Sequence, residues 1–571
     1  MKFSDDDDES FSQNLNIYLL KENYTEEEAI KKTKRSFINK FSLKKEYEID
    51  GSFFFLENER KQPKWLPLIK EIISEDQSNL LKLNKSYTPS GLLIFIIKNK
   101  YIAISFGYGY TLLDYDSFEY DFGIKTTINF INPQKIRALK TKSLELSPTE
   151  TEKSSYHAKS INELNINGES QLLRLVSGIP LDNSKIKHIS GAQSIIIKSS
   201  YSIIELKEIC KQLLDYYQSD NYLQYFGWID YIKIVRDIEK ISYLDKILVE
   251  NFNKMQLDNF SFYPPIYSNY SYDCSLYIKR KDLLQNIDVD EFTIKDIASL
   301  FNSYKLSKED FNGIHVQAKS DSGELIDQVS LYKSLIFEYK DNTDYYLLNE
   351  GNWYKIDDNY YQIIENFYAN IEKTFSSAFL LPWRFGFNNK NEEKKECEAT
   401  YNKRICGKNN TKYVVFDKEN ISYNGKKFEF CDIFTKDLEI IHVKRYWNGS
   451  SSLSHIFVQS SVSAKLLRSS DEVRTQIKEK LPGKNWNKVK NELGDTLNPK
   501  KFTIKYAILK KFNEKEIDMP LLFKIGIMDS INLLKAYGYN FELVFINSEE
   551  NPVEVDLLKC PKKSDEGNNS K

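Results

Sequence analysis

The chain has 571 residues, of which 41% are hydrophobic and 28% are charged. This length and apolar content exclude a domain with a single core, and they exclude a chain that is disordered over most of its length. Lys and Arg, 80 together, nearly balance the 82 Asp and Glu, so any contact with nucleic acid must use a local basic patch.

The N-terminal part begins with alternating strand and helix patterns. Residues 1–10 are acidic and are expected to be a disordered tail. LNIYLL (15–20) predicts a strand, TEEEAIKKTKRSFINKF (25–41) predicts a helix with Thr25 as its N-cap, and GSFFFLE (51–57) predicts a second strand. This order is typical of an α/β unit.

The next apolar segments complete the first predicted domain. GLLIFIIKNKYIAISFGYGYTLL (91–113) holds two β-rich runs separated by Lys-Asn-Lys at 98–100, which predicts a hairpin. DFGIKTTINFI (121–131) is expected to extend the same sheet. We therefore predict an N-terminal α/β domain over residues 11–142.

A polar, hydroxyl-rich stretch over residues 143–170 predicts a linker. The following residues, 171–386, predict one or more central domains that mix helices with a β-meander. The helical run spans 203–252, where apolar residues recur every three or four positions. The meander ends at LYKSLIFEYKDNTDYYLLNEGNWYKID (331–357), in which NEGN is the expected turn.

A second polar stretch over residues 387–412 predicts a linker before a C-terminal domain at 413–555. YVVFDKENISYNGKKFEFCDIFTKDLEIIHVKRY (413–446) predicts three strands, and a helix is expected to start near 453. A strand, a helix and a strand follow. The fold class is therefore α/β (α+β) and multidomain, with a C-terminal mixed sheet flanked by helices and a disordered tail at 556–571.

Four polar side chains are candidates for one site in this C-terminal domain. His442 and Lys444 occupy positions i and i+2 of the strand IIHVK, so they are expected to face the same way. Asp432 lies on the preceding strand and can come alongside if the intervening turn closes a hairpin, and Glu429 lies further along that strand. The pattern predicts a constellation of acid, histidine and lysine.

This arrangement resembles the restriction-endonuclease-like core, whose motif is an Asp, a spacer, then Asp or Glu, any residue and Lys. The resemblance implies that Asp432 binds a divalent metal, Mg²⁺ or Mn²⁺, and that Lys444 orients the attacking water and offsets phosphorane charge, and we add Glu429 as an auxiliary metal ligand. His442 stands where the second acid belongs. Either the metal differs, Glu429 or Glu439 compensates, or the core binds nucleic acid without cutting it.

Three further residues are candidates for contacts with nucleic acid. His455 and Gln459 share one helix face by the i, i+4 rule, and Arg445 follows the lysine directly. In an alternative interpretation, His455 is a packed interior histidine. In another, His442 and Lys444 lie on the half-exposed face of an edge strand and nothing is catalysed.

Several strings along the chain, above all CDI, IHVK and LSHIFVQSSVSA within residues 431–464, resemble a sporadically distributed bacterial family of unknown function. Its members have a similar length and are found near restriction and mobile elements. The resemblance implies phage defence rather than housekeeping. It supplies no catalytic residues.

We expect an anti-phage defence protein whose C-terminal domain is a metal-dependent endonuclease that cleaves DNA. The alternative is a sensor or scaffold without catalysis, which binds nucleic acid or a phage protein and signals to a partner protein of the defence system. A third hypothesis, a phosphoesterase acting on nucleotides, requires a deep pocket beside His442.

The location is predicted from the N-terminus and the cysteines. The acidic start is unlike a signal peptide, and no apolar stretch reaches the ~18 residues that span a bilayer. The six cysteines show no CxxC spacing, which predicts reduced thiols. A cytoplasmic protein without a membrane partner is expected.

Overall fold

The computed structural model describes residues 13–59, 87–144, 149–164, 168–181, 186–199, 202–264, 274–287, 294–320, 323, 325–342, 344–375, 380–389, 393–408, 411–417, 420–446, 453–512 and 517–559. The predicted tail at 1–10 and most of the tail at 556–571 lie outside these residues. The chain divides into two compact units. The first comprises Met1–Ser143 and Glu150–Ile229, and the second comprises Leu144–Thr149 and Asp230–Lys571.

The first unit is built on a ten-stranded antiparallel sheet with the order β2-β3-β4-β5-β1-β10-β9-β8-β6-β7. Its strands are β1 (Gln13–Leu19), β2 (Asn39–Ser42), β3 (Gly51–Glu59), β4 (Tyr87–Ile97), β5 (Lys100–Gly107), β6 (Ile131–Ser143), β7 (Glu150–Lys159), β8 (Gln171–Pro180), β9 (Ile189–Gly191) and β10 (Ile195–Ser199). The hairpin of β4 and β5 turns at Lys98 and Asn99, where φ is 49° and 62°. The hairpin was predicted at this position, and two consecutive left-handed residues suit the twist of its paired strands.

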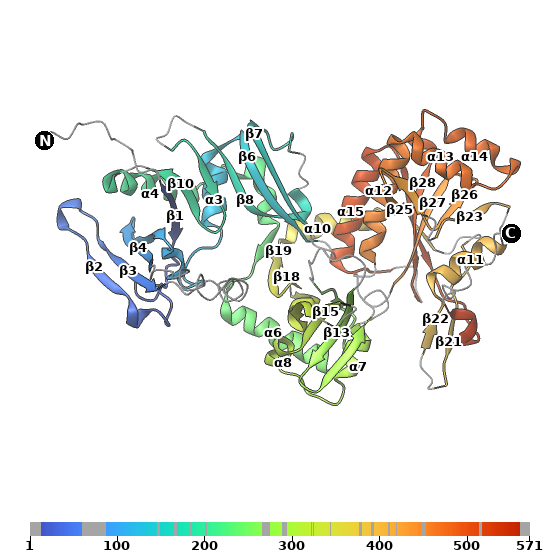
Figure 1. Cartoon of the computed structure of the whole chain (residues 1–571), viewed down its shortest axis with the longest axis horizontal. Helices are drawn as coiled ribbons and strands as arrows, with labels where there is room; N and C mark the ends of the chain where they lie inside the picture. The colour runs from blue at the N-terminus through green and yellow to red at the C-terminus, as the bar shows by residue number, and fades with distance from the viewer. Residues whose placement is uncertain are drawn as a thin grey trace, which may run out of the picture. The chain divides into compact units, whose positions relative to one another are not determined.

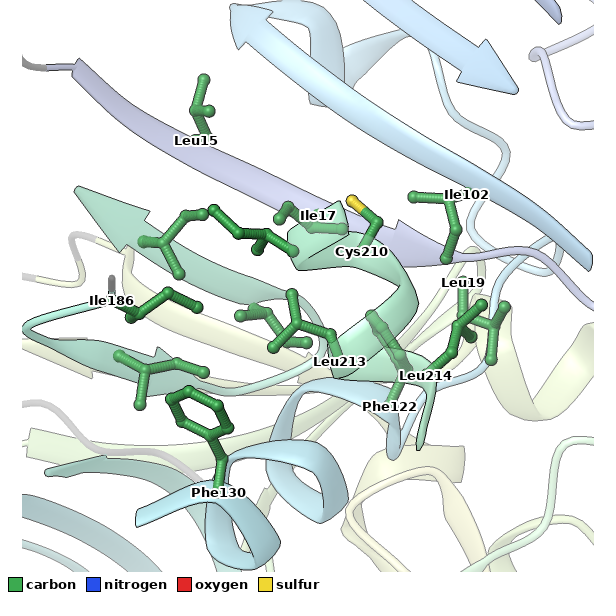
Figure 2. Packing of buried hydrophobic residues seen from close by; sticks show 14 of the residues in the cluster. Leu15, Ile17, Leu19, Ile102, Phe122, Phe130, Ile186, Cys210, Leu213 and Leu214 are labelled. Atoms are coloured by element: carbon green, nitrogen blue, oxygen red, sulfur yellow. The ribbon is translucent and has the colours of Figure 1, made fainter. Parts of the chain in front are cut away.

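Two helices, α3 (Phe122–Phe130) and α4 (Ile203–Tyr217), pack against this sheet, and the short helix α5 (Leu223–Phe226) follows them. Figure 2 shows Leu213 and Leu214 of α4 and Phe122 of α3 gathered with Ile17 of β1. These side chains belong to one buried apolar cluster. Removing such a surface from water is the main force that holds helices on a sheet.

Helix α3 lies so close to β9 that a side chain would fit neither at Gly123 of the helix nor at Gly191 of the strand. A Cβ atom added to Gly191 would lie 2.0 Å from the carbonyl oxygen of Gly123, and one added to Gly123 would lie 2.4 Å from the carbonyl oxygen of Ala192. Both distances are far below van der Waals contact. Glycine is therefore required at both positions for the helix to seat against the strand.

The predicted helix at 25–41 is wrong. This segment forms turns, a 3-10 helix at Arg35–Phe37 and the start of β2. Thr25 and Glu28 make the reciprocal hydrogen bonds of a capping box. No long helix follows, because Lys31 N–H donates to Leu112 O and Ala29 O accepts from Asp114 N–H, so these groups bond to another segment.

The predicted strand at 121–131 is also wrong, because this segment is helix α3. Seven of its nine residues are buried and none is exposed, so the helix has no solvent-facing side, and its β-branched residues mimic a strand pattern. The first unit also extends beyond the predicted domain at 11–142. Residues after 142 supply β7 to β10 of the same sheet, and β7 lies inside the predicted linker at 143–170.

The second unit begins with two antiparallel sheets, in the orders β11-β19-β18-β17-β12 and β14-β13-β15-β16. Their strands are β11 (Ile232–Ile234), β12 (Phe260–Phe262), β13 (Cys274–Arg280), β14 (Leu283–Ile287), β15 (His315–Ser320), β16 (Leu325–Ser330), β17 (Leu335–Asp341), β18 (Asp344–Asn349) and β19 (Asn352–Ile356). The helices are α6 (Ile238–Asn253), α7 (Ile294–Leu300), α8 (Lys308–Gly313), α9 (Leu331–Ser334) and α10 (Asp358–Ala369). The meander of β17 to β19 turns at Glu350 and Gly351, as predicted.

The C-terminal part of the second unit is a six-stranded mixed sheet with the order β20-β29-β28-β27-β26-β23. The four strands β20, β29, β28 and β27 are parallel, and β26 and β23 continue antiparallel. The sheet strands are β20 (Lys373–Phe375), β23 (Tyr413–Val415), β26 (Ile433–Thr435), β27 (Glu439–Arg445), β28 (Thr503–Leu509) and β29 (Asn540–Ile546). Two hairpins stand apart from it, β21 (Phe385–Phe387) with β22 (Glu393–Lys395) and β24 (Asn420–Tyr423) with β25 (Lys426–Glu429).

Helices flank this sheet, as predicted. They are α11 (Glu398–Lys408), α12 (Ser454–Ser469), α13 (Asp471–Lys480), α14 (Asn487–Glu492) and α15 (Leu521–Ala536). Ile441 and Val443 of β27 pack in one apolar cluster with Tyr401 of α11. Figure 1 shows α11 on one side of the sheet and α12 with α15 on the other. The predicted linker at 387–412 therefore contains α11, which packs on the sheet.

Within the described residues, no helix is long and apolar enough to cross a membrane. Cys210, Cys406 and Cys431 are buried free thiols. Cys397 is disulfide-bonded, which corrects the prediction of reduced thiols at that position.

Candidate functional site

Asp432 is fixed at the start of the β26–β27 hairpin by backbone groups on both sides. Its N–H donates to Ile441 O at 3.0 Å, and its Oδ2 accepts from Val443 N–H at 2.8 Å. Its own carbonyl oxygen accepts from Phe416 and Asp417 N–H, which follow β23. The hairpin thus closes as predicted and holds this carboxylate between the ends of three chain segments.

Two further carboxylates converge on Asp432. One oxygen each from Asp417, Glu429 and Asp432 lies within 4.8 Å of the others, and we call these three residues the acidic cluster. Asn402 of α11 is fully buried behind them, and its Nδ2 donates to Asp432 Oδ1 at 3.3 Å and to Asp417 Oδ2 at 3.4 Å. Its Oδ1 has no hydrogen-bond partner within the described part of the chain. The structure therefore brings together the two predicted metal ligands, Glu429 and Asp432, and adds a third acid.

Burial and the crowding of like charges strongly perturb Asp432. Burial raises the pKa of Asp432 well above its usual range, and the neighbouring carboxylates of Glu429, Asp417 and Glu398 raise it further. The hydrogen bond from Val443 N–H acts in the opposite direction and is outweighed. A carboxyl group in this position is costly to ionise, and a bound cation would remove that cost.

This perturbation predicts a pH-dependent stability. The pKa of Asp432 in the folded state lies above its value of about 3.8 in the unfolded chain, so the folded state binds this proton more tightly. Its contribution to stability is present below the unfolded pKa and is lost as pH rises through the folded pKa. The Asp432→Asn variant lacks this titration, so the unfolding free energy of the variant minus that of the wild type should increase with pH.

Chemical denaturation from about pH 5 to about pH 8 measures this difference. Adding Mg²⁺ or Mn²⁺ at the upper pH should stabilise the wild type and leave Asp432→Asn nearly unchanged. A difference that stays constant or shrinks with rising pH would contradict the assigned pKa. The matched control is Asp437→Asn, an exposed residue in the turn of the same hairpin.

Lys444 and Glu398 form a polar pair beside the cluster. Lys444 Nζ lies 3.0 Å from Glu398 Oε2, and Glu398 Oε1 accepts from the backbone N–H of Arg445 at 2.9 Å. Both side chains are about a quarter exposed. Glu398 begins α11, and its charge also acts on the pKa of Asp432. This carboxylate therefore links the predicted lysine to the acidic cluster.

His442 is not brought to the acidic cluster. It is fully buried, and its ring lies 6.3 Å from the ring of Tyr506 of β28, centre to centre. Neighbouring residues of a strand face opposite ways, and Val443 packs toward α11, so His442 faces α12. Burial lowers the pKa of His442 to about 3, and the nearby Gln459 side chain partly opposes this without forming a hydrogen bond of ordinary geometry. The imidazole is neutral near pH 7.

The three predicted nucleic-acid contacts are dispersed. His455 is exposed in the first turn of α12, whereas Gln459 is half-buried on the same helix and faces His442. Arg445 Nη1 donates to Glu396 O at 2.9 Å. Glu439, the alternative second acid, is engaged elsewhere, because its Oε1 lies 2.7 Å from Lys505 Nζ.

The model of a family of unknown function, DUF6119, matches residues 15–547. The chain belongs to this family. No curated protein and no solved structure matches the chain. The match to DUF6119 spans both compact units and includes every residue of the acidic cluster.

In this DUF6119 chain, sequence reasoning missed Asp417, Glu398 and Asn402. Asp417 directly follows the apolar run YVVF, and an acid at the end of a strand was the available signal. Glu398 and Asn402 fell in the stretch predicted as a linker. The spacing of Tyr401 and Ile405, four residues apart and both buried, was the helical signal in that stretch.

Proposed function

We propose that the C-terminal part of the second unit is a divalent-metal-dependent phosphodiesterase that acts on nucleic acid, with DNA as the expected substrate. One observation carries the proposal: the carboxylates of Asp417, Glu429 and Asp432 converge within 4.8 Å beside the Lys444–Glu398 pair. Converging carboxylates with one adjacent lysine are the groups that metal-assisted phosphoryl transfer needs.

The donor set fits Mg²⁺ or Mn²⁺ rather than a softer ion. All three donors of the acidic cluster are carboxylate oxygens, which hard cations prefer, whereas Zn²⁺ favours nitrogen and sulfur. Asn402 donates to two of these carboxylates through its amide nitrogen, and its amide oxygen has no hydrogen-bond partner among the described residues. Burial, and after it the neighbouring carboxylates, raise the pKa of Asp432, and a bound cation would favour its ionised form.

The order of elements supports a resemblance to the restriction-endonuclease-like core. Helix α11 is followed by the three antiparallel sheet strands β23, β26 and β27, then by α12 and the parallel strand β28. The acid precedes the middle strand and the lysine lies near the end of the third. Glu429 and Asp417 would supply the acid that His442 cannot provide.

Each residue would have a distinct role in hydrolysis of a phosphodiester. A bound cation would stabilise negative charge on the reacting phosphate as a Lewis acid. The acidic cluster would hold that cation, and Lys444 would place a positive charge beside the phosphate as a water oxygen attacks phosphorus and the P–O bond to the leaving alcohol breaks. Glu398 would orient Lys444 through the contact of 3.0 Å.

Substitution Lys444→Ala should lower the rate of cleavage about 100-fold, because about 3 kcal/mol of charge stabilisation in the transition state is lost. The test incubates the purified full chain with plasmid and with RNA in Mg²⁺ or Mn²⁺. Lys427→Ala, which removes an exposed lysine from β25, is the matched control and should cleave like the wild type. Cleavage that survives in Lys444→Ala would contradict the site assignment.

A second candidate function is a sensor that binds nucleic acid or a phage protein without cutting. The neutral, buried His442 at the position of the expected second acid favours it. Absence of cleavage with either metal, together with retained binding, would support the sensor. The role in phage defence, common to both functions, rests on the family resemblance drawn from the sequence.

A further inference from the structure

A polar cavity of about 460 Å³ lies in the second unit, at the carboxyl ends of two parallel strands. Tyr446 directly follows β27 and Lys510 directly follows β28, and both line the cavity. The first residues of α15 close one side. In open α/β sheets, ligands bind at the carboxyl ends of the strands, and this volume is typical of a site for a small molecule.

Glu338 of β17 lines this cavity and is fully engaged. Its carboxylate accepts from Leu521 N–H at 2.8 Å, from Leu522 N–H at 3.3 Å and from the hydroxyl of Tyr345. It thus satisfies the free N–H groups at the start of α15. The buried carboxyl group therefore caps the helix and is not open to a ligand.

Lys524 is likewise compensated within the protein. Its Nζ lies 2.7 Å from Glu365 Oε1 of α10 and 2.6 Å from Asp518 Oδ1. A buried ammonium with two carboxylates needs no further anion. Asp258 is the remaining acid of the cavity wall, and it is exposed at the surface.

Lys510 differs from Glu338 and Lys524, the buried charged residues in the cavity wall. Its Nζ contacts the carbonyl oxygen of Asp518 at 3.2 Å and the sulfur of Met519 at 3.7 Å, and it lies 4.5 Å from the ring centre of Tyr446. Among the described residues, no carboxylate oxygen lies within 4.0 Å of it. Burial lowers the pKa of Lys510, while the more distant charges of Asp518 and Asp258 oppose this. A half-buried cation without an ion-pair partner favours an anionic ligand.

Aromatic side chains supply a second kind of contact in the same cavity. The rings of Tyr345 and Tyr361 are stacked at 4.9 Å between centres with an interplanar angle of 29°. Tyr446 adds a third ring on the wall formed by the strand ends. Stacking on such rings is the contact by which proteins bind nucleobases of any sequence.

We propose that this cavity binds a nucleoside monophosphate group, with the phosphate on Lys510 and the base against the tyrosines. The group is either a free mononucleotide or the phosphorylated end of a nucleic-acid chain, which share this chemistry. The proposal goes beyond phosphodiester cleavage and does not depend on it.

Calorimetric titration of the full chain with adenosine monophosphate tests the proposal, with adenosine and inorganic phosphate as the partial ligands. Adenosine monophosphate should bind more tightly than either one. Lys510→Gln should weaken its binding about tenfold or more, because a charge-assisted contact is lost. Lys511→Gln is the matched control, because Lys511 is exposed and lies over the ring of Phe385 outside the cavity. Lys510→Arg, which keeps the charge, should retain binding.

Equal affinity of the wild type and Lys510→Gln, or no preference for adenosine monophosphate over adenosine, would overturn the proposal. Competition by an oligonucleotide with a 5′-phosphate, but not by one without it, would identify a chain end as the source of the group. Failure of the oligonucleotide to compete would identify the mononucleotide. Asp432→Asn should bind adenosine monophosphate like the wild type, so this test can succeed even if the phosphodiesterase proposal fails.

Discussion

Asp432→Asn is expected to reduce metal-dependent cleavage of nucleic acid at least ~100-fold, the largest effect on activity that the structure predicts. The substitution keeps an oxygen that can accept from Val443 N–H, so the hairpin should stay intact. It removes the charge at the centre of the acidic cluster, and with it the affinity for a hard cation. Initial rates at saturating metal and at limiting metal measure the two effects separately.

Asp437→Asn is the control for this experiment, because it removes one acid from the same hairpin at an exposed position. It should retain the activity of the wild type. If Asp432→Asn cleaved at the rate of the wild type, the acidic cluster could not be the metal site. If both variants lost the same amount of cleavage activity, the net charge of the hairpin rather than the cluster would be the cause.

Gly191→Ala should destabilise the first unit by about 3 kcal/mol, because the added methyl group would overlap the backbone of α3. The clashing atoms are the carbonyl oxygen of Gly123 at 2.0 Å and Thr127 Oγ1 at 2.3 Å. A carbonyl oxygen in a helix cannot move aside as a flexible side chain can. Helix α3 would have to lift from β9, which would disturb the apolar cluster that Figure 2 shows.

Thermal and urea unfolding of the full chain measure this change, with tryptophan fluorescence as the signal. Gly227→Ala is the matched control in the same unit, because its Cβ atom would meet nothing within 4 Å and its backbone is helical. It should leave stability unchanged or raise it by about 0.5 kcal/mol. If the Gly191→Ala protein were as stable as the control, α3 could not lie as close to β9 as described.

The parts of the fold that were predicted correctly are those where a local pattern decides the conformation. Lys98 and Asn99 tolerate the left-handed turn between two apolar runs, and α12 repeats buried apolar residues at helical spacing, at Ile456, Phe457, Ala464 and Leu467. The segment 121–131 was missed because it is buried on nearly every side, which erases the period that distinguishes a helix from a strand. The segment 25–41 was missed because its backbone bonds to residues 112–114, which no local pattern reveals.

The candidate site, like the fold, was predicted in part. The hairpin that carries Asp432 and Lys444 followed from turn residues between strands. Glu429 was expected further along the strand of Asp432, but it ends β25 of a separate hairpin and lies close to Asp432 from there. The sequence did not reveal toward which side of β27 the side chains of Lys444 and His442 point. Lys444 lies at the strand end and contacts Glu398 of α11, whereas His442 is enclosed under α12. Side-chain alternation gives two faces, but only packing determines which helix covers each.

The position of β1 bears on how the first unit is assembled during synthesis. This strand is hydrogen-bonded to β5 on one side and to β10 on the other, with Gln13 opposite Ser199. The ribosome must therefore release residue 199 before the sheet can close. Until then one edge of β1 is unpaired and open to association with other nascent chains. Slow folding is expected for this unit, because its central pairing joins distant segments. A fragment ended at 142 would present that open edge permanently.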